Sequence, residues 1–333
     1  MTKNLGVLLV FLLLTVPAWA QQRPQYSQYM INSYLLNPAI TGIEDYTEVK
    51  IGTRQQWIGL EGAPKTYHVS AHTPLNKEVK SVRSGKGLTS TRTVNRNRFV
   101  RAYPHHGVGI QAISDKTGPL RRTNVNLTYA YHLPITRTIT VSMGASAGIL
   151  RNSFNPAEAT FTNPDPAISS SYVNRNYFDV GLGTWIYSPH FFVGLSGAQL
   201  IKSERDLNTE EGEVTNGILQ RHFIGTAGYK FDISREVTLI PSVLVKLTNP
   251  SPTTIDYNLR ALYAERFWVG VSYRNQDAFA LMTGVNISHI MDVSYSYDYN
   301  TSPLNVANSG SHEIVLGLKL FNKGKVVCPR WMH

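Results

Sequence analysis

Cysteine, charge and long apolar runs are all scarce in this chain of 333 residues. The one cysteine, Cys328, excludes an intramolecular disulfide and any zinc site built from cysteine alone. Charged residues make up 16 % of the sequence, and it shows no heptads, low-complexity linker or helical repeat. After residue 20, no apolar run reaches the roughly 20 residues that a transmembrane helix needs. If the chain lies in a membrane, it must cross it as a closed barrel of strands.

The first twenty residues have the organisation of a secretory signal peptide. Lys3 supplies the positive start, an apolar run follows from Leu5 to Val16, and Ala18-Trp19-Ala20 provides the cleavage pattern. We therefore predict a signal peptide over residues 1–20 and a mature chain that begins at Gln21. A buried N-terminal helix is the alternative interpretation.

Period-two alternation recurs in stretches of about ten residues, the length of a tilted membrane strand. Between Thr138 and Ile149, for example, apolar residues occupy odd positions and small or polar residues occupy even ones. The 18 tyrosines favour strands, and the 25 glycines disfavour helices. We predict fourteen strands, an even number as in bacterial single-chain barrels. They begin near residues 46, 65, 107, 121, 138, 177, 191, 221, 237, 253, 266, 278, 291 and 311.

Two features favour a membrane barrel over the alternative, a soluble β-sandwich. The expected connections alternate between tight turns and long loops, as in outer-membrane barrels with short periplasmic turns. The expected turns are 133–136, 188–190, 232–236, 264–266 and 288–290, and the long external loops are 155–175, 201–219 and 300–311. Ionisable residues also lie in mid-strand on the polar face, where they would line a wet lumen: Asp179, Asp256, Arg260, Asp292 and Lys319.

These patterns predict an all-β fold, a transmembrane antiparallel barrel of about 14 strands with a polar lumen, over residues 46–321. Residues 21–45 would precede it as a periplasmic or plug segment, with an unstructured lead as the alternative. Residues 322–333 would form a periplasmic C-terminal extension.

The net charge of +10 comes largely from one segment, residues 76–105. It contains eight Lys or Arg residues and one acidic residue, Glu78. An exported protein meets no nucleic acid, so we interpret this segment as a solvated loop that contacts anionic lipid or an acidic partner. By the parity of the strands it lies on the periplasmic side.

The motifs that could carry chemistry do not fit their required contexts. The glycine pairs at 107 and 109 and at 181 and 183 lie inside expected strands with no following helix, which excludes a nucleotide loop. His312-Glu313 is followed by Leu316 where a zinc protease needs a second histidine. No serine or cysteine has the neighbourhood of an activated nucleophile.

Two metal sites are conceivable but not favoured. His68 and His72 share a strand face without a third ligand in sequence, so hydroxyl-paired lumen histidines are the better interpretation. Glu210, Glu211 and Glu213 lack calcium-loop spacing, which favours a solvated acidic loop. We therefore predict no catalytic residue, no cofactor and no metal.

Three stretches resemble the PorP/SprF family of type IX secretion system outer-membrane proteins. They are Gln25–Met30 with Leu36–Gly42, then Arg54–Gly59 with Gly62–Thr66, and finally His312–Ile314 with the ending Cys328-Pro329-Arg330. The basic segment is longer than the family pattern, and Trp331-Met332-His333 extends the end. The resemblance singles out the following residues as structural or partner-binding: Gln28, Asn37, Pro38, Gly42, Arg54, Gln56, Trp57, Pro64, Thr66, His312, Glu313, Cys328, Pro329 and Arg330.

The resemblance implies an outer-membrane protein that serves type IX secretion and, in some relatives, gliding motility. Such a protein would help a secreted client with a type IX C-terminal domain to reach or stay attached to the cell surface. The three external loops would hold the client, while the N-terminal segment and the basic loop would face periplasmic components of the system. Outer-membrane lipid would surround the barrel. The alternatives are a diffusion channel or substrate-selective transporter and, third, a barrel hydrolase.

Overall fold

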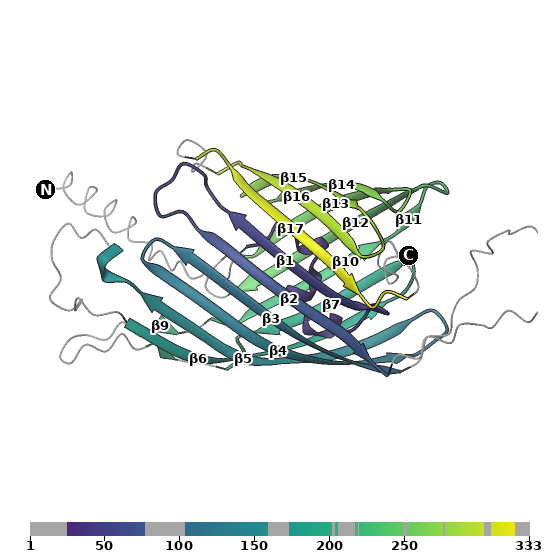
Figure 1. Cartoon of the computed structure of the whole chain (residues 1–333), viewed down its shortest axis with the longest axis horizontal. Helices are drawn as coiled ribbons and strands as arrows, with labels where there is room; N and C mark the ends of the chain where they lie inside the picture. Colours follow the sequence, from purple (N-terminus) through teal and green to yellow (C-terminus); the bar gives the residue numbers. More distant parts are fainter. Residues whose placement is uncertain are drawn as a thin grey trace, which may run out of the picture.

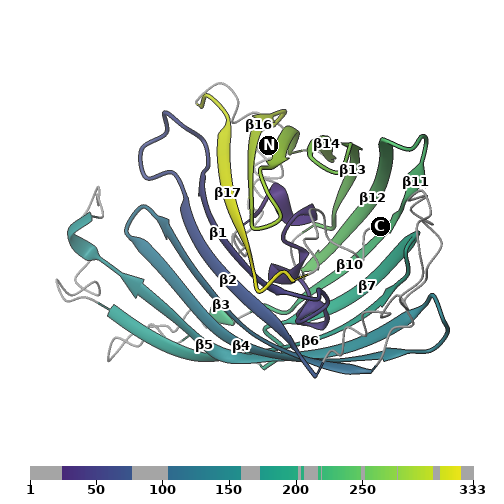
Figure 2. The same ribbon diagram turned by 45° about the vertical axis from the view of Figure 1, so that its right-hand side comes forward.

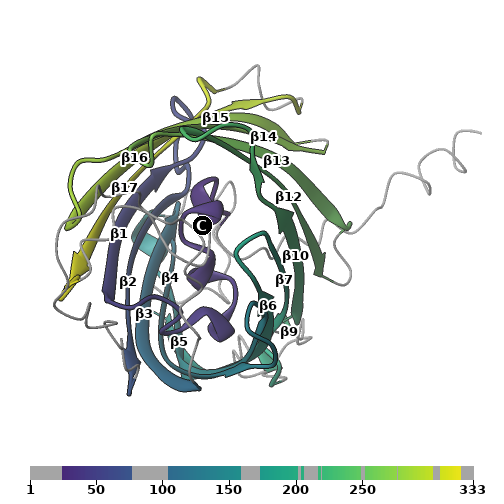
Figure 3. The same ribbon diagram turned by 90° about the vertical axis from the view of Figure 1, so that its right-hand side faces the viewer.

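A computed structural model describes residues 25–76, 104–158, 173–201, 204–205, 217–218, 220–248, 252–275, 277–302 and 308–323. The predicted signal peptide, the glutamates at 210–213, the motif Cys328-Pro329-Arg330 and nearly all of the basic segment lie outside these ranges. Within them the chain forms a closed ring of antiparallel strands, seen from the side in Figure 1 and along its length in Figure 3.

Each strand pairs with its neighbours in sequence, and the last strand pairs with the first to close the ring. The segments His222–Tyr229 and Phe231–Asp232 both pair with the strand Val237–Thr248. We therefore count them together as one of fourteen ring strands. The strands are β1 Thr47–Gln55, β2 Lys65–Leu75, β3 His105–Thr117, β4 Leu120–Pro134, β5 Thr140–Phe154, β6 Val173–Tyr187, β7 Phe191–Ala198, β10 His222–Tyr229 with β11 Phe231–Asp232, β12 Val237–Thr248, β13 Thr254–Tyr263, β14 Phe267–Arg274, β15 Ala278–Asn286, β16 Met291–Asn300 and β17 Ser311–Leu320. A separate pair, β8 Glu204–Arg205 and β9 Gly217–Ile218, forms a small sheet.

The fourteen-strand prediction is confirmed, and every predicted start lies within four residues of the observed one. The largest difference is at β6, which begins at Val173 rather than near 177. Its first residues are polar, Asn174 to Asn176, so the apolar alternation that marks a lipid-facing strand begins only after them. The strand continues beyond the part that the pattern could detect.

The two faces of the wall have the expected polarity. On β4, Leu127 is 65 % exposed on the outside, while its neighbours Asn126 and Thr128 are buried inside. The five mid-strand charges predicted for the lumen are all buried as well: Asp179, Asp256, Arg260, Asp292 and Lys319. This arrangement suits a wall between lipid and a polar interior, and it confirms the polar lumen.

The two ends of the ring differ. At the turn end, strands are joined by residues 135–139, 188–190, 233–236, 264–266 and 287–290, and the basic segment joins β2 to β3 there. At the loop end lie the long connections 56–64, 155–172, 199–221 and 301–310, together with the short ones 118–119, 249–253 and 275–277. Strands β3 to β6 have 13 to 15 residues, whereas β7 and β14 have 8. The ring is therefore taller on one side, as Figure 2 shows for the blue and teal strands.

The polypeptide before β1 lies inside the ring. Residues 25–46, here called the lumen segment, contain three single-turn 3-10 helices: η1 Gln28–Met30, η2 Ser33–Leu35 and η3 Pro38–Ile40. A fourth, η4 Pro156–Glu158, follows β5 outside the lumen. The purple trace in Figure 3 runs through the centre of the ring. The expected wet lumen is therefore occupied by polypeptide along this path. Among the described residues, no helix is long and apolar enough to cross a membrane.

Candidate functional site

The lumen segment is held by the barrel wall along its whole length. None of residues 25–46 is exposed, and most are buried. Its start lies at the loop end and its last residues lead into β1 at the turn end, so it runs the length of the ring. Such a segment is positioned to control what passes through the lumen or binds at its ends.

At the loop end, the segment is fixed by a buried charge cluster. Arg54 on β1 contacts Asp298 on β16 through Nη2 at 2.7 Å and Glu313 on β17 through Nη1 at 3.2 Å. The backbone nitrogen of Ser27 donates to Glu313 at 2.8 Å, and the Ser27 hydroxyl donates to Asp298. Gln28 donates from Nε2 to the Glu313 carbonyl at 2.8 Å. One cation and two carboxylates are thus buried together with the start of the segment, and the Arg54 guanidinium compensates both carboxylates in part.

The middle of the segment is held by tyrosine and amide contacts. The Tyr34 hydroxyl lies 2.6 Å from the Thr128 hydroxyl on β4, and Gln111 on β3 donates to the Tyr34 carbonyl at 2.6 Å. On the other side of the lumen, Asn258 on β13 donates to the Tyr29 hydroxyl at 2.6 Å.

Asn37 joins the segment to the wall at η3. Its side chain accepts from the Ala39 backbone nitrogen at 2.9 Å, which caps the short helix that Pro38 begins. Its amide nitrogen donates to the carbonyls of Thr184 and Leu195 at 3.0 and 3.2 Å. One side chain therefore both shapes the turn and attaches it to β6 and β7.

Wall glycines allow η3 and the following turn to approach the strands closely. A side-chain carbon at Gly144 would lie 2.5 Å from the Ala39 nitrogen, and one at Gly107 would overlap the Thr41 carbonyl. Gly42 itself has φ +75°, a conformation that favours glycine, and it packs against Gly107. These contacts explain why β3 and β5 carry glycine on their inner faces.

At the turn end, three histidines surround the Thr41–Gly42 peptide. The Gly42 nitrogen donates to His72 Nδ1 at 3.2 Å. His132 Nε2 lies 2.8 Å from the Thr41 carbonyl, and His105 Nε2 lies 3.1 Å from the Gly42 carbonyl. The rings of His105 and His132 stack with centroids 4.4 Å apart. The expectation of lumen histidines paired with hydroxyls is therefore wrong for His72, which binds backbone and lies 3.2 Å from Glu48.

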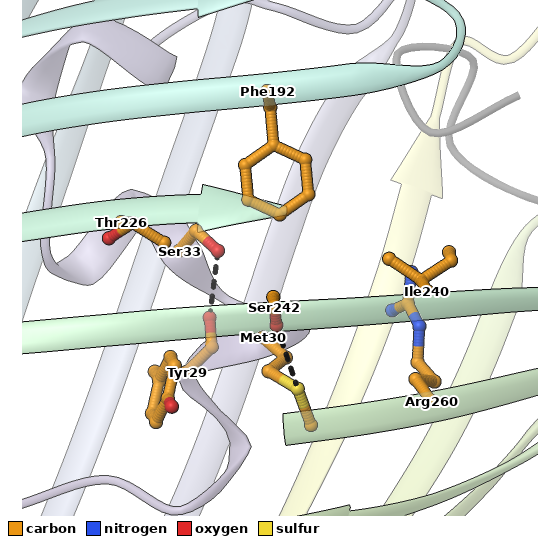
Figure 4. A pocket seen from close by; sticks show the side chains of 8 residues that line it. All are labelled: Tyr29, Met30, Ser33, Phe192, Thr226, Ile240, Ser242 and Arg260. Carbon is orange, nitrogen blue, oxygen red and sulfur yellow. Dashed lines mark hydrogen bonds between the residues drawn. The ribbon is translucent and has the colours of Figure 1, made fainter. Parts of the chain in front are cut away.

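A pocket lies between η1 and the strands on the shorter side of the ring. Figure 4 shows Tyr29, Met30 and Ser33 from the segment facing side chains of β7, β10, β12 and β13. Its volume is about 20 Å³, room for about one water molecule. The side chains that line it are Tyr29, Met30, Ser33, Phe192, Thr226, Ile240, Ser242 and Arg260.

The structure brings several motif residues together where β1 pairs with β17. Gln28, Arg54 and Glu313, from three separate stretches, meet in the charge cluster. The hairpin after β1 is closed by the Gln56 nitrogen donating to the Pro64 carbonyl at 3.0 Å, and the Trp57 nitrogen donates to the Ser311 hydroxyl at 3.2 Å. Sequences far apart along the chain thus form one structural unit.

The remaining motif residues lie elsewhere. Thr66 donates to Asp115 at 2.6 Å inside the loop end. His312 is on the outer face, where its Nδ1 lies 2.6 Å from the Tyr295 hydroxyl. Asn37, Pro38 and Gly42 are on the segment. Cys328, Pro329 and Arg330 fall outside the described residues.

Sequence reasoning missed the wall residues that hold the segment, above all Asp298, Gln111, His105 and His132. A signal was present for Asp298, Gln111 and His132, because each is a polar or charged side chain on the inward face of an expected strand, whereas His105 fell in the predicted basic loop. Their partners could not be identified without knowing that residues 25–46 enter the lumen. No group of three or more His, Cys, Asp or Glu side chains in the described part of the chain is arranged to hold a metal ion.

Comparisons with solved structures find other barrels at low identity. Omp33 of Acinetobacter baumannii is 9 % identical with a TM-score of 0.47, over 84 % of this chain and all of that one. The toluene transporter TbuX of Ralstonia pickettii is 9 % identical with a TM-score of 0.48, over 86 % and 93 %. A FadL homologue of Pseudomonas aeruginosa is 10 % identical with a TM-score of 0.47, over 85 % and 91 %. No curated protein matches the sequence.

The family comparison covers most of the chain. A model described as type IX secretion system membrane protein PorP/SprF matches residues 18–318. This range includes the lumen segment and every ring strand up to the end of β17 except its last two residues. The chain is an outer-membrane β-barrel associated with secretion rather than an enzyme, and it belongs to the PorP/SprF family of type IX secretion system membrane proteins.

Proposed function

We propose that this protein docks a secreted client that carries a type IX C-terminal domain and holds it at the cell surface. The loop end then faces the exterior, and the turn end faces the periplasm. Loops 155–175 and 201–219, with 300–311, contact the client, and the basic loop 76–105 faces periplasmic components of the secretion system. Gliding motility would depend on the same attachment of the client to the cell surface.

The observation that carries this proposal is a stretch of β6 at the loop end that, in the described part of the chain, pairs on one side only. β5 pairs with β6 along all fifteen residues from Val173 to Tyr187, but β7 pairs with β6 only from Leu182 onward. The Leu200 nitrogen donates to the Val180 carbonyl at 3.0 Å. Among the described residues, nothing pairs with the same side of β6 from Asn174 to Phe178, here called the β6 edge.

The β6 edge has the geometry for adding a strand from a partner. The backbone N–H and C=O groups of successive residues point to alternate sides of a strand. The Val180 carbonyl points away from β5, so the backbone groups of Asn174, Asn176 and Phe178 also point away from β5. Asn174 and Asn176 are exposed, and along the chain the edge comes at the end of the predicted client loop 155–175. Edge pairing supplies affinity through main-chain hydrogen bonds, while the neighbouring loops supply specificity.

The lumen segment further supports docking over the channel alternative. It occupies the lumen from the charge cluster to the three histidines, with none of its residues exposed. We propose that it acts as a plug, so that the barrel offers a surface rather than a path. The side chains of the lumen segment contact the barrel strands, so they are not available to a partner. We therefore assign contact with periplasmic components to the basic loop.

The test is a pull-down of tagged protein from gently solubilised outer membranes, with partners identified by mass spectrometry. Wild type should recover a large secreted protein with a type IX C-terminal domain. Deletion of 201–219 should leave a folded barrel that no longer retains this client. Asn176→Pro removes one edge N–H that points away from β5, so it should weaken retention severalfold.

Asn176→Ala is the matched control, because it changes the same side chain but keeps the edge N–H. It should retain the client as wild type does. Unchanged retention in both the deletion and Asn176→Pro would refute docking at this place. A wild-type barrel that comes down alone and conducts steadily in planar bilayers would favour the channel instead.

A further inference from the structure

The outward face of β2 to β5 changes abruptly from apolar to basic near the loop end. The apolar side consists of one row of laterally paired residues, Val69, Ala112, Val125 and Ile149. Val69, Val125 and Ile149 are 44 %, 41 % and 53 % exposed, as lipid-facing residues should be. This row marks where the hydrocarbon contact approaches its limit on this side of the ring.

Within four residue pairs of that row, the same face presents four cations on four consecutive strands. Lys65 on β2 lies opposite Lys116 on β3, and Lys116 lies opposite Arg121 on β4. Arg151 on β5 lies opposite Thr123, one step closer to the apolar row. Because residues two apart share a face, all four point outward with the apolar row. Neighbouring strands are about 4.8 Å apart, so this basic row spans about 15 Å.

Among the described residues, one carboxylate forms an ion pair with this row, and it cannot cancel four positive charges. Glu158 on η4 lies 2.8 Å from Lys116, and Asn155 donates to its other oxygen at 3.0 Å. The nearby carboxylate of Asp115 is on the opposite face of β3, where it accepts from Thr66. Three of the four positive charges are therefore in excess, and Lys65, Arg121 and Arg151 are exposed.

The basic row is specific to this side of the barrel. At the same end of β13 to β16 the outward side chains are aromatic, with Tyr257, Tyr273, Phe279 and Tyr299 all exposed. No Lys or Arg occurs on the outward faces of β13 to β17 as the structure describes them. Aromatic girdles are the ordinary boundary of a membrane barrel, so a row of cations in place of one calls for a separate explanation.

We propose that the basic row, Lys65, Lys116, Arg121 and Arg151, binds the phosphate groups of a phosphorylated glycolipid in the outer leaflet. The acyl chains of such a lipid lie along the apolar row while its phosphates sit directly above, at the level of the cations. The outer leaflet of an outer membrane consists largely of lipid with this chemistry. Basic side chains at a membrane boundary attract anionic headgroups, and arginine suits the planar, bidentate binding of phosphate. The proposal uses the orientation given under the proposed function but requires no client.

Binding of such a lipid would fix the tall side of the ring in the membrane. β3 to β6 are the strands that rise past their neighbours, and β6 carries the edge proposed for the client. Three of the four cations lie on β3 to β5, the strands that precede β6 in the ring. A bound glycolipid would therefore support the part of the wall that presents the docking surface.

The test measures lipid binding to the purified full chain by native mass spectrometry. The probe is bisphosphorylated lipid A in mixed micelles, compared with the same lipid after removal of both phosphates. The test variant carries Lys65→Gln, Lys116→Gln, Arg121→Gln and Arg151→Gln. The matched control carries Arg137→Gln, Arg235→Gln, Arg266→Gln and Lys323→Gln, four exposed cations at the turn end with the same change in net charge.

Wild type and the control should bind lipid A equally, and the test variant should bind at least about tenfold more weakly. Removal of the phosphates from the lipid should cost wild type a similar factor. Equal binding by the test and control variants would overturn the proposal, as would equal binding of phosphatidylglycerol by wild type. Unaltered lipid binding by the test variant together with loss of an acidic protein partner in pull-downs would overturn it in favour of a protein surface. Since no client enters the lipid measurement, its failure is distinguishable from failure of client docking.

Discussion

Arg54 and Glu313 lie directly opposite each other where the first and last strands of the barrel pair, with Arg54 Nη1 3.2 Å from the Glu313 carboxylate. The Ser27 nitrogen donates to the same carboxylate oxygen at 2.8 Å. Closure of the ring and placement of the lumen segment therefore depend on the same buried group. The motifs at the two ends of the chain belong together because they build this contact.

Replacement of Arg54 by leucine should destabilise the barrel strongly. It would leave Asp298 and Glu313, both 1 % exposed, buried without their cation, and breaking a buried ion pair costs about 3–5 kcal/mol. The measurement is the midpoint of urea unfolding in detergent, followed by tryptophan fluorescence. Arg151→Leu, at an exposed arginine, should change stability by no more than about 0.5 kcal/mol. If Arg54→Leu unfolds at the wild-type midpoint, the cluster does not hold the segment.

Substitution of Gly144 by alanine should loosen the lumen segment. The new methyl group would lie 2.5 Å from the Ala39 nitrogen, and overpacking of this kind costs about 1–3 kcal/mol. The measurement uses Leu35→Cys in a Cys328→Ser background and follows the rate at which a maleimide labels the new thiol. Gly144→Ala should raise that rate about tenfold or more.

Gly270 supplies the matched control for this experiment. It faces the lumen as well, but a methyl group there would be 3.6 Å from its nearest atoms, an ordinary contact. Gly270→Ala should therefore leave the labelling rate unchanged. Equal rates in both variants would mean that the segment is not packed against β5 as described.

Asn37→Ala tests whether one side chain both caps η3 and attaches it to the wall. Loss of the cap costs about 1 kcal/mol, and each lost hydrogen bond costs about 0.5–1.5 kcal/mol. Hydrogen exchange of the amides in 38–41, measured by mass spectrometry, should accelerate. Asn37→Ser keeps the cap but loses the bonds to Thr184 and Leu195, so it should lie between wild type and Asn37→Ala. Identical exchange in Asn37→Ser and Asn37→Ala would assign the whole effect to the wall contacts.

Much of the barrel could be predicted from the sequence because strand alternation is a local property. Each ring strand repeats the outside–inside pattern within about ten residues, so its position could be predicted without knowledge of its neighbours. Val125, Leu127 and Tyr129 on β4 are exposed, and the polar residues between them are buried, as that pattern requires. Charged residues in the middle of strands, such as Asp179, then indicated that the inner face lines a polar lumen and does not form an apolar core.

The interior could not be predicted in the same way, because its contacts join residues far apart in sequence. Ser27 and Glu313 are 286 positions apart, and nothing local to either one indicates the other. The segment has no alternation to detect, only three short 3-10 turns, which are weak patterns in sequence. Glycines such as Gly144 looked ordinary for a strand, and their reason became evident only once η3 was seen to pack against them.

Conductance of single barrels in planar bilayers tests the lumen segment most directly. Wild type should be nearly silent, because residues 25–46 are buried within the ring from end to end. Deletion of residues 26–42 should produce steady pores, since it removes the polypeptide but leaves β1 to β17 with their polar inner face. The barrel without residues 26–42 must still change its mobility on gels when heated, which shows that it has folded.

Asn37→Ala keeps the segment but weakens its attachment to the wall. This variant should therefore conduct in brief openings, with a mean conductance between that of wild type and that of the deletion. Steady wild-type conductance equal to that of the deletion would mean that the segment does not occlude the lumen, and the channel interpretation would then stand in place of a plugged docking barrel.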